Sequence, residues 1–512
     1  MTPDSLAAVL QDYLGNASDA VILENGAVLF DLAQSKYSVS GEYNKCLLQV
    51  WSNERNIVRR VLDAELKHDT LRVTIQKLGQ AKPSKLEICR NRDRRTPTAK
   101  RVARMAYQRK LERALQRRFP DFKLLPLHTA MDLERSFGPI YARGMIRKGQ
   151  SAFAVLGANE QETQSSIDAA LTFGILWLDV CRQSHAGKLV IEGLKLFVPR
   201  ECSSLIRERL AHLNAQAAKW HLYEFDERED AVTEIDPSDR GNIATRLVHC
   251  PDETAVHERF ATEIARVKSI MSEAEIAILS PAEIAFRCHG LEFARARLSQ
   301  KPSPPNKTEI VFGLGAEEAV LSETTGFRFE LLIRSIGEVR HLEGPRDHPL
   351  FRMHPERWLE SLVVNQVGDL DERLDISCVY SQVPAFSASD RAMIDVLTAT
   401  RQGRLAVIEL KADEDIHLPL QGLDYWSRVA WHHERGEFQR FNYFPGKELV
   451  REKPLLLLVA PALRVHPATD TLLRYISQDV DWTVVAIDER WRNGVRVVFR
   501  KRTRQLSAGA VA

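Results

Sequence analysis

The chain has 512 residues, of which 44% are hydrophobic and 27% are charged, and these values are ordinary for a globular protein of about two to four domains. No run of about 18 apolar residues occurs, and the N-terminal segment MTPDSLAAVLQDYLG has acidic residues where a signal peptide has a basic start, so we expect no membrane association and a cytoplasmic location. The seven cysteines are scattered without a C-x-x-C pair, which argues against a zinc ribbon and a disulfide scaffold.

Positive charge is concentrated in one segment of the chain. Residues 82–118 include 14 Lys and Arg residues but only three acidic residues, so this segment has a charge of +11. Because the net charge of the whole chain is +2, the remainder has a charge of −9. This asymmetry favours a surface that faces a polyanion.

Residues 1–120 are predicted to form a mixed α/β region that ends in a basic helix. The segment AVILENGAVLFDL predicts a β-hairpin with Asn25-Gly26 at its turn, and TLRVTIQKL alternates like a half-buried strand. Residues 98–118 predict an amphipathic helix, whose apolar residues near helical spacing are Val102, Met105, Ala106, Leu111 and Leu115.

The basic segment is a candidate nucleic-acid-binding surface. Its cations could neutralise phosphates, and the candidates are Arg94, Arg95, Lys100, Arg101, Arg104, Arg109 and Lys110. Tyr107 could stack on a base. The alternative is a solvated helix face without a ligand.

Residues 121–297 predict a central α/β domain with a largely covered sheet, because predicted strands such as SAFAVLG, KLVIEGLKLFVP and WHLYEFDE alternate with predicted helices. Two further helices are expected near 253–273 and 281–298. We detect no internal repeat. Glu192 and Lys195 leave open a second, degenerate nuclease-like unit, although their E-x-x-K spacing would point them to opposite faces of a strand.

Residues 298–345 are predicted to contain a linker followed by strands. The linker is LSQKPSPPNKTE, and the segments EIVFGLG and FRFELLIRSIGEVRHL are expected to form strands. No Walker loop, G-x-G-x-x-G or helicase motif occurs, so no ATP motor is expected.

Residues 346–505 predict a C-terminal domain that begins with a helix, HPERWLESLVVNQ, and continues with the strand RLDISCVYSQVPAF. The segments AMIDVLTA and RLAVIELK then flank a short turn. If Gly403 is the left-handed residue of a three-residue loop, Asp395 lies directly opposite Glu409. Side chains alternate along a strand, so Lys411 shares the face of Glu409.

The residue types on this face of the predicted hairpin predict metal-assisted phosphodiester hydrolysis. Two carboxylates so close repel each other unless they are protonated or bridged by a cation, and oxygen ligands suit Mg²⁺ or Mn²⁺. A neighbouring Lys can neutralise the charge that develops on a phosphate. On the next helix, HLPLQGLDYWSRVAWHHERG, Gln421 and Tyr425 are four residues apart and share one face. The alternative is a buried ion pair without a catalytic role.

Together, Asp395, the triplet Glu409-Leu410-Lys411 and the pattern Gln421-x-x-x-Tyr425 resemble a PD-(D/E)XK nuclease domain with a Q-x-x-x-Y motif, as in RecB-like nucleases. The segment that runs from ERWLESLVVNQ to QGLDYW is most similar to the catalytic domain of NucS-type endonucleases. The sequence departs from the family signature at one position, because Ile394 and not Pro precedes Asp395.

The resemblance implies a fold, a site and a cofactor. The fold would be a multidomain α/β protein whose C-terminal domain is restriction-endonuclease-like, with αβββαβ order and a mixed sheet flanked by helices. The metal ligands would be Asp395, Glu409 and Glu360, with Glu356 one turn from Glu360. Lys411, Gln421 and Tyr425 would complete the catalytic set, with Mg²⁺ or Mn²⁺ as cofactor.

The expected function is a metal-dependent DNA endonuclease in repair, restriction or defence. The substrate would be double-stranded, single-stranded or branched DNA, and a homodimer would allow both strands to be cut. The alternatives are a nuclease that acts on RNA, or a catalytically inactive nucleic-acid-binding or scaffold protein.

Overall fold

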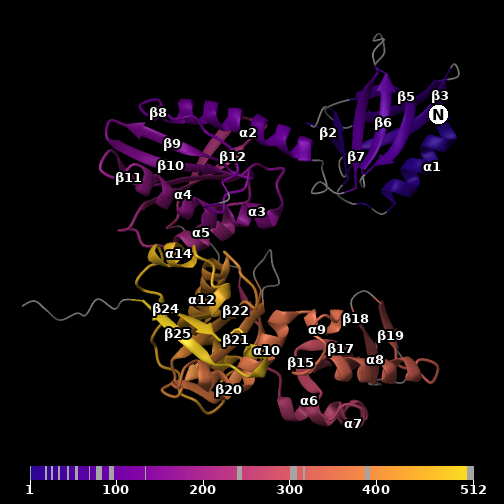
Figure 1. The fold of residues 1–512 in the computed structure, drawn as a ribbon, viewed down its shortest axis with the longest axis vertical. Helices are drawn as coiled ribbons and strands as arrows, with labels where there is room; N and C mark the ends of the chain where they lie inside the picture. The colour runs from indigo at the N-terminus through magenta and orange to yellow at the C-terminus, as the bar shows by residue number, and fades with distance from the viewer. Residues whose placement is uncertain are drawn as a thin grey trace, which may run out of the picture. The chain divides into compact units, whose positions relative to one another are not determined.

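The computed structural model describes residues 2–503, except residues 16, 18–19, 25–26, 33–34, 43–44, 52–55, 68–69, 77–82, 91–96, 133, 239–244, 300–307, 315–316 and 387–392 (Figure 1). The chain divides into two compact units, one of residues 1–210 with 215–239 and the other of residues 211–214 with 240–512. Both units are mixed α/β, as the sequence predicts. None of the helices in the described part of the chain is long and apolar enough to cross a membrane.

A seven-stranded antiparallel sheet forms the start of the first unit. Its spatial order is β2-β1-β7-β6-β5-β4-β3, with β1 (Val21–Glu24), β2 (Ala27–Asp31), β3 (Lys36–Glu42), β4 (Lys45–Trp51), β5 (Asn56–Lys67), β6 (Thr70–Gln76) and β7 (Ser84–Cys89). Helix α1 (Pro3–Leu14) buries Leu6 and Leu10 in the core of this sheet. The predicted hairpin is present as β1 and β2, although its turn residues Asn25 and Gly26 lie outside the described residues.

The second sheet of this unit, which we call the central sheet, is mixed. Its spatial order follows the chain, with β8 (Lys123–Leu124), β9 (Ala142–Lys148), β10 (Ser151–Gly157), β11 (Val190–Pro199), β12 (Lys219–Asp226) and β13 (Ala231–Ile235). Strands β10, β11 and β12 are parallel, and the other neighbours are antiparallel. The connecting helices are α3 (Gln164–Asp168), α4 (Ala170–Ser184) and α5 (Ser204–Leu210). The predicted alternation of strands and helices is confirmed here.

Helix α2 (Pro97–Arg118) packs against the central sheet with part of the predicted face. Leu111 and Leu115 are buried as predicted, and they share a core with Tyr107 and with Phe225 of β12. Met105, which we expected in the apolar stripe, is 45% exposed, and Ala106 is exposed as well. The prediction is wrong for these two residues, because Tyr107 and the small residues Ala99 and Ala103 complete the buried face.

The second unit begins with a five-stranded antiparallel sheet, β15 (Glu275–Ser280), β16 (Glu283–Cys288), β17 (Leu291–Leu298), β18 (Thr308–Leu314) and β19 (Glu317–Val320). Helices α6 (Glu253–Arg259) and α7 (Ala261–Lys268) precede it, and α8 (Gly326–Val339) follows it. Two sequence predictions are wrong here. Residues 281–298 form the hairpin β16–β17, whose turn residues His289 and Gly290 both have positive φ, and FRFELLIRSIGEVRHL forms α8.

The C-terminal sheet has seven strands in the order β14-β20-β21-β22-β23-β24-β25, with β14 (Arg246–Leu247), β20 (Leu374–Phe386), β21 (Met393–Thr400), β22 (Leu405–Leu410), β23 (Leu455–Pro461), β24 (Asp481–Ile487) and β25 (Val497–Arg502). Strands β22, β23 and β24 are parallel, and the other neighbours are antiparallel. The helices are α9 (Pro349–Arg352), α10 (Pro355–Asn365), α11 (Val367–Leu370), α12 (Leu418–Glu434), α13 (Glu437–Arg440) and α14 (Thr469–Arg474). The predicted first helix and hairpin of this region are confirmed as α10 and β21–β22.

Arg340, at the end of α8, joins the five-stranded sheet to α10. Its guanidinium is fully buried and donates hydrogen bonds to the carbonyls of Cys288, His289, Leu350 and Met353, at 2.7–2.9 Å for the shortest contact to each. It also lies 4.7 Å from the ring centre of Trp358 on α10. Burial lowers the pKa of Arg340 to about 10, so the side chain stays charged at neutral pH. Arg340 therefore holds α10 in place against the five-stranded sheet.

We predict that Arg340→Met lowers the free energy of unfolding of the second unit by about 3 kcal/mol, because buried carbonyls would lose their donors. Urea unfolding followed by tryptophan fluorescence measures this loss. Arg334→Met is the matched control, because Arg334 lies on the same helix, is 68% exposed and makes only a 3.8 Å ion pair with Glu330. The control should change stability by less than about 0.5 kcal/mol, and equal losses in both variants would contradict the prediction.

Candidate active site

The hairpin β21–β22 has the predicted register. Gly403 has φ of +88°, and the amide of Thr400 donates to the carbonyl of Arg404 at 2.7 Å. Val396 pairs with Ile408, so the preceding residue Asp395 falls opposite Glu409. The amide of Leu410 donates to Oδ2 of Asp395 at 3.1 Å, which holds this carboxylate across the hairpin.

Glu409 is a carboxylate inside the core, with only 1% of its surface exposed. Lys411 Nζ donates to its Oε1 at 3.1 Å, while its Oε2 is buried without a hydrogen-bond partner among the described residues. Burial, and then the nearby charge of Asp395, raise the pKa of Glu409 well above its ordinary value. A buried acceptor without a donor is unusual in a folded protein, and here either a cation or a proton shared with Asp395 would satisfy it.

Lys411 supplies the positive charge of this face. Burial acts to lower the pKa of its ammonium, but the carboxylates of Glu409, Glu356 and Asp395 outweigh burial and raise the pKa above the ordinary value. Lys411 therefore remains protonated at neutral pH. It can neutralise and hydrogen-bond an anion, and it is a poor general base in this state.

Helix α10 brings a third carboxylate to the site. Glu360 is 4% exposed, and its Oε2 accepts hydrogen bonds from Arg357 at 2.6 Å and Gln382 at 2.8 Å. Burial raises the pKa of Glu360 to about 7, against the opposing effect of Arg357. Gln382 on β20 has a left-handed φ of +52°, and strained backbone of this kind concentrates at functional sites.

Helix α12 lies close against the sheet at Gly422. A Cβ at this position would meet Leu458 of β23 at 2.5 Å, and it would lie 3.6 Å from the Cβ of Glu409. The neighbouring Gln421 has its Oε1 buried without a partner among the described residues. Burial, and then the charges of Glu409 and Asp395, raise the pKa of Tyr425. Close packing at Gly422 therefore brings Tyr425 of this helix near Glu409 and Asp395.

The structure brings the predicted residues to one place. The charge of Asp395 acts on five other ionisable side chains, which are Glu356, Glu360, Glu409, Lys411 and Tyr425. Sequence reasoning missed Arg357 and Gln382, which hold Glu360. Arg357 stands three residues before Glu360 on the helix, and this spacing could have revealed it. No local pattern points to Gln382, because it comes from a separate strand.

The donor set suits a hard divalent cation. Asp395 and Glu409 offer carboxylate oxygens, and the unpartnered oxygens of Glu409 and Gln421 are acceptors that a cation would satisfy. Among the described residues, no three His, Cys, Asp or Glu side chains are grouped closely enough to hold a metal ion. Glu360 is held by Arg357 and Gln382 in this conformation, so the pair Asp395 and Glu409 forms the core of the candidate site.

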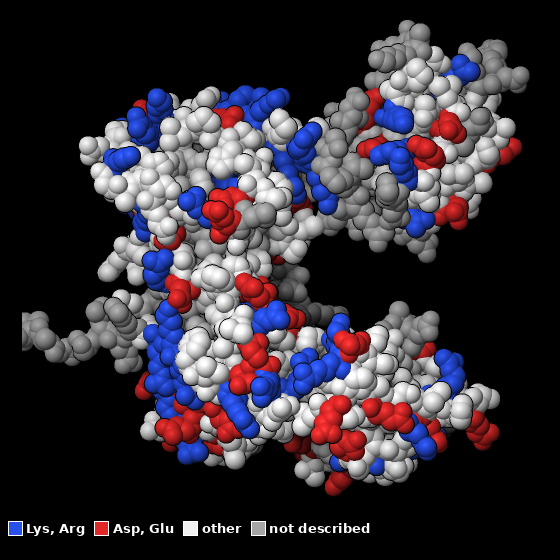
Figure 2. Space-filling model, viewed as in Figure 1, with Lys and Arg blue, Asp and Glu red and all other residues white. Residues whose placement is uncertain are grey.

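The basic helix α2 is the second predicted site, and Lys and Arg side chains gather over it (Figure 2). These cations differ in whether they pair with acids of the fold. Two of the predicted residues are engaged within the fold, because Arg104 binds Glu162 and Lys110 binds Glu227. Lys100, Arg101 and Arg109 make no ion pair with any described residue, and the same holds for Arg113, which the sequence prediction omitted. Arg94 and Arg95 lie outside the described residues.

Tyr107 does not serve as a stacking platform. Its side chain is 2% exposed and lies 6.0 Å from the ring of Phe225, measured between ring centres. Arg101, Arg109 and Arg113 are exposed on the opposite face of α2. Contact with nucleic acid would therefore depend on phosphates and not on base stacking.

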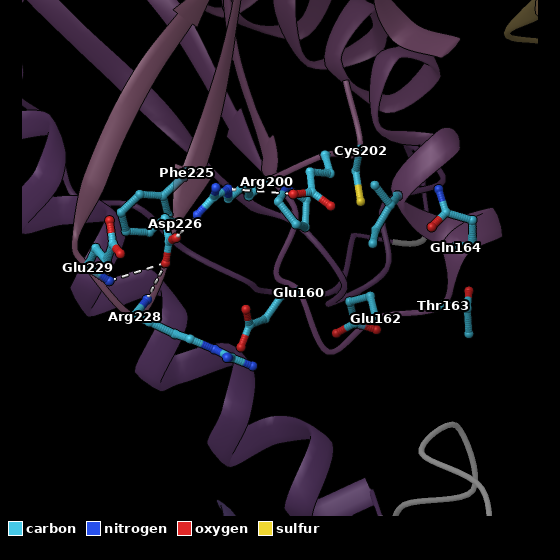
Figure 3. A pocket seen from close by; sticks show the side chains of 13 residues that line it. Glu160, Glu162, Thr163, Gln164, Arg200, Cys202, Phe225, Asp226, Arg228 and Glu229 are labelled. Atoms are coloured by element: carbon cyan, nitrogen blue, oxygen red, sulfur yellow. Dashed lines mark hydrogen bonds and ion pairs between the residues drawn. The ribbon is translucent and has the colours of Figure 1, made fainter. Parts of the chain in front are cut away.

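A hollow of about 920 Å³ lies at the carboxyl ends of β10, β11 and β12 (Figure 3). Five carboxylates and two guanidiniums line it, so its net charge opposes a phosphate backbone. Several of its acids are already satisfied. Glu162 accepts two hydrogen bonds from Arg104, and Asp226 accepts from the amides of Arg228 and Glu229. We therefore place the candidate active site at Glu409 and not in this hollow.

Comparisons of the chain with protein-family models, with curated proteins and with solved structures give no match.

We predict that Glu409→Gln raises the free energy of unfolding by about 1 kcal/mol in the presence of EDTA, because the variant removes a buried charge that faces Asp395. Urea unfolding at pH 8 measures the gain. Glu452→Gln is the matched control, because the side chain of Glu452 is 69% exposed. The control should leave stability unchanged, and a loss of stability in Glu409→Gln would contradict the prediction.

If helix α2 contacts DNA, as the sequence predicts, Arg109→Ala combined with Arg113→Ala should weaken DNA binding and lower the slope of log affinity against log salt by about 2, because two phosphate contacts would be lost. Fluorescence anisotropy over a range of salt concentrations measures both effects. Arg104→Gln is the control, because this guanidinium is bound to Glu162. It should affect stability more than affinity. An unchanged salt slope in the double variant would show that α2 does not contact DNA.

Proposed function

We propose that the second unit is a Mg²⁺- or Mn²⁺-dependent endonuclease that hydrolyses phosphodiester bonds of DNA. The observation that carries this proposal is the buried Glu409, opposite Asp395 and beside Lys411, with one carboxylate oxygen left without a partner. A purely structural ion pair would not require a second carboxylate across the hairpin. The order α10, β20, β21, β22, α12, β23 also agrees with the resemblance to PD-(D/E)XK nucleases.

The proposed roles follow from the chemistry of each side chain. Asp395 and Glu409 would hold the divalent cation, and Glu360 would be an additional carboxylate ligand. When bound, such a cation polarises the phosphate and activates water as a nucleophile. The ammonium of Lys411 would bind a phosphate oxygen and neutralise the charge that develops there. Gln421 and Tyr425 would orient the carboxylates or the phosphate from α12.

We predict that Glu409→Gln and Lys411→Ala each lower Mn²⁺-dependent DNA cleavage by about 100-fold or more. Plasmid, circular single-stranded and branched DNA are the substrates, with EDTA as the metal-free reaction, and an RNA of matched sequence tests the alternative substrate. Lys453→Ala is the matched control, because Lys453 is 48% exposed and pairs with the exposed Asp479. It should cleave like the wild type.

Calorimetry separates this proposal from a non-catalytic scaffold role. The wild type should bind Mn²⁺, and Asp395→Asn should bind it at least about tenfold more weakly. A protein that binds DNA but neither binds Mn²⁺ nor cleaves any of the substrates would refute the endonuclease proposal and favour the scaffold.

A further inference from the structure

The central sheet repeats the topology of the C-terminal sheet. From β8 to β13, consecutive neighbours are antiparallel, antiparallel, parallel, parallel and antiparallel, and the same sequence of directions runs from β20 to β25. Helices occupy matching places in the chain, with α2, α4 and α5 corresponding to α10, α12 and α14. The expectation that the chain has no internal repeat is therefore wrong at the level of the fold.

The registers of the two sheets also agree. In the central sheet Gly193 to Pro199 pair with Lys219 to Phe225, and in the C-terminal sheet Leu455 to Pro461 pair with Asp481 to Ile487. The partners are 26 residues apart in both sheets, and the first strand of each pair ends in proline. A tryptophan is the second residue of the partner strand in both sheets, at Trp220 and Trp482.

Two independent contacts support this correspondence. A Cβ on Gly174 of α4 would meet Leu194 and Leu196, while a Cβ on Gly422 of α12 would meet Leu456 and Leu458, which are the matching positions. Beyond the first parallel strand, the amide of Ala158 donates to the carbonyl of Phe197 at 3.0 Å. The amide of Lys411 donates to the matching Val459 at the same distance.

This correspondence assigns a central-sheet residue to each candidate catalytic position. Leu156 pairs with Leu196 as Glu409 pairs with Leu458, so Leu156 stands in the place of Glu409. Arg143 lies opposite Leu156 and stands in the place of Asp395. Counting along the strands and helices then places Ala158 at Lys411, Phe173 at Gln421 and Trp177 at Tyr425. None of these five residues is a carboxylate.

Arg143 places a positively charged side chain where the C-terminal sheet has the carboxylate of Asp395. It is 1% exposed, and its guanidinium donates to the carbonyls of Gly138 and Ala130. It lies over the rings of Phe137 and Trp177, at 4.8 and 5.8 Å from the ring centres. A fixed positive charge on this side chain excludes a divalent cation from the same place. The earlier candidates Glu192 and Lys195 lie elsewhere, since Glu192 binds Lys219 and Lys195 binds the hydroxyl of Tyr223.

We propose that residues 97–235 are a second copy of the C-terminal fold that has no metal site, so that one chain has one catalytic centre and cuts one strand of duplex DNA per binding event. This inference rests on the proposed endonuclease function. Double-strand breaks then require a second chain, because one centre hydrolyses one phosphodiester at a time.

Supercoiled plasmid tests the number of strands that one chain cuts. With limiting wild-type protein and Mn²⁺, nicked circles should accumulate first, and linear DNA should follow after a lag that shortens as protein concentration rises. Linear DNA that forms without a nicked intermediate, at a rate proportional to chain concentration, would overturn the inference.

Mn²⁺ binding tests whether the central copy lacks a metal site, independently of DNA cleavage. Calorimetry with Mn²⁺ should detect binding to the wild-type chain and none to the double variant Asp395→Asn, Glu409→Gln. Leu156→Met is the position-matched control in the central copy and should bind Mn²⁺ like the wild type. Residual Mn²⁺ binding in the double variant, at an affinity close to that of the wild type, would overturn the inference. A wild-type chain that neither binds Mn²⁺ nor cleaves DNA would instead refute the proposed function on which this inference rests.

Discussion

The register between β21 and β22 is the constraint on which the candidate site depends. Gly403 provides the left-handed residue of the turn, and this turn fixes which residue of β21 faces each residue of β22. A shift by one residue would turn Glu409 to the other face and separate it from Asp395. Helix α12 covers this face and packs closely against it at Gly422, where a Cβ would lie 2.5 Å from the side chain of Leu458, and Gln421 and Tyr425 belong to the same helix. Arg340 fixes α10, and with it Glu360, from the other side.

The sequence predicted the hairpin β21–β22 and helix α12 better than it predicted the rest of the fold, for a physical reason. A short hairpin and a helix directly after it determine each other through local spacing, so Asp395, Glu409, Lys411, Gln421 and Tyr425 could be assigned before the structure was known. The helix prediction for residues 281–298 was wrong because Glu and Ala favour helices. The tight turn at His289 and Gly290 and the pairing with β18 stabilise two strands there instead. Gln382 could not be predicted, since only the pairing of β20 with β21 brings it to Glu360.

The charge of α2 shows a different limit of sequence reasoning. Composition identified a cationic segment, but it could not distinguish cations that bind the protein itself from cations that face solvent. Arg104 and Lys110 neutralise Glu162 and Glu227 in the fold, so only part of the positive charge is available to a ligand. The local charge of a segment therefore overestimates its capacity to bind phosphates, and the difference depends on acids that lie far away in the sequence.

Comparison with the central sheet helps to explain why Glu409 is buried. The same order, directions and register form with Leu156 and Arg143 at the positions of Glu409 and Asp395, so this fold does not require carboxylates there. A buried carboxylate with an unpartnered oxygen lowers stability, and an apolar residue of similar size would fill the same space without that penalty. The central copy has the apolar Leu156 in place of the buried carboxylate. The guanidinium of Arg143 across the hairpin donates to two carbonyls and lies over aromatic rings, while its Nε is buried without a partner among the described residues. The other copy keeps the buried carboxylate, with Lys411 and Tyr425 around it. A destabilising arrangement that the fold does not need is best explained by a function that does need it, and for two carboxylates and an ammonium the function that we propose is the binding of a cation and a phosphate.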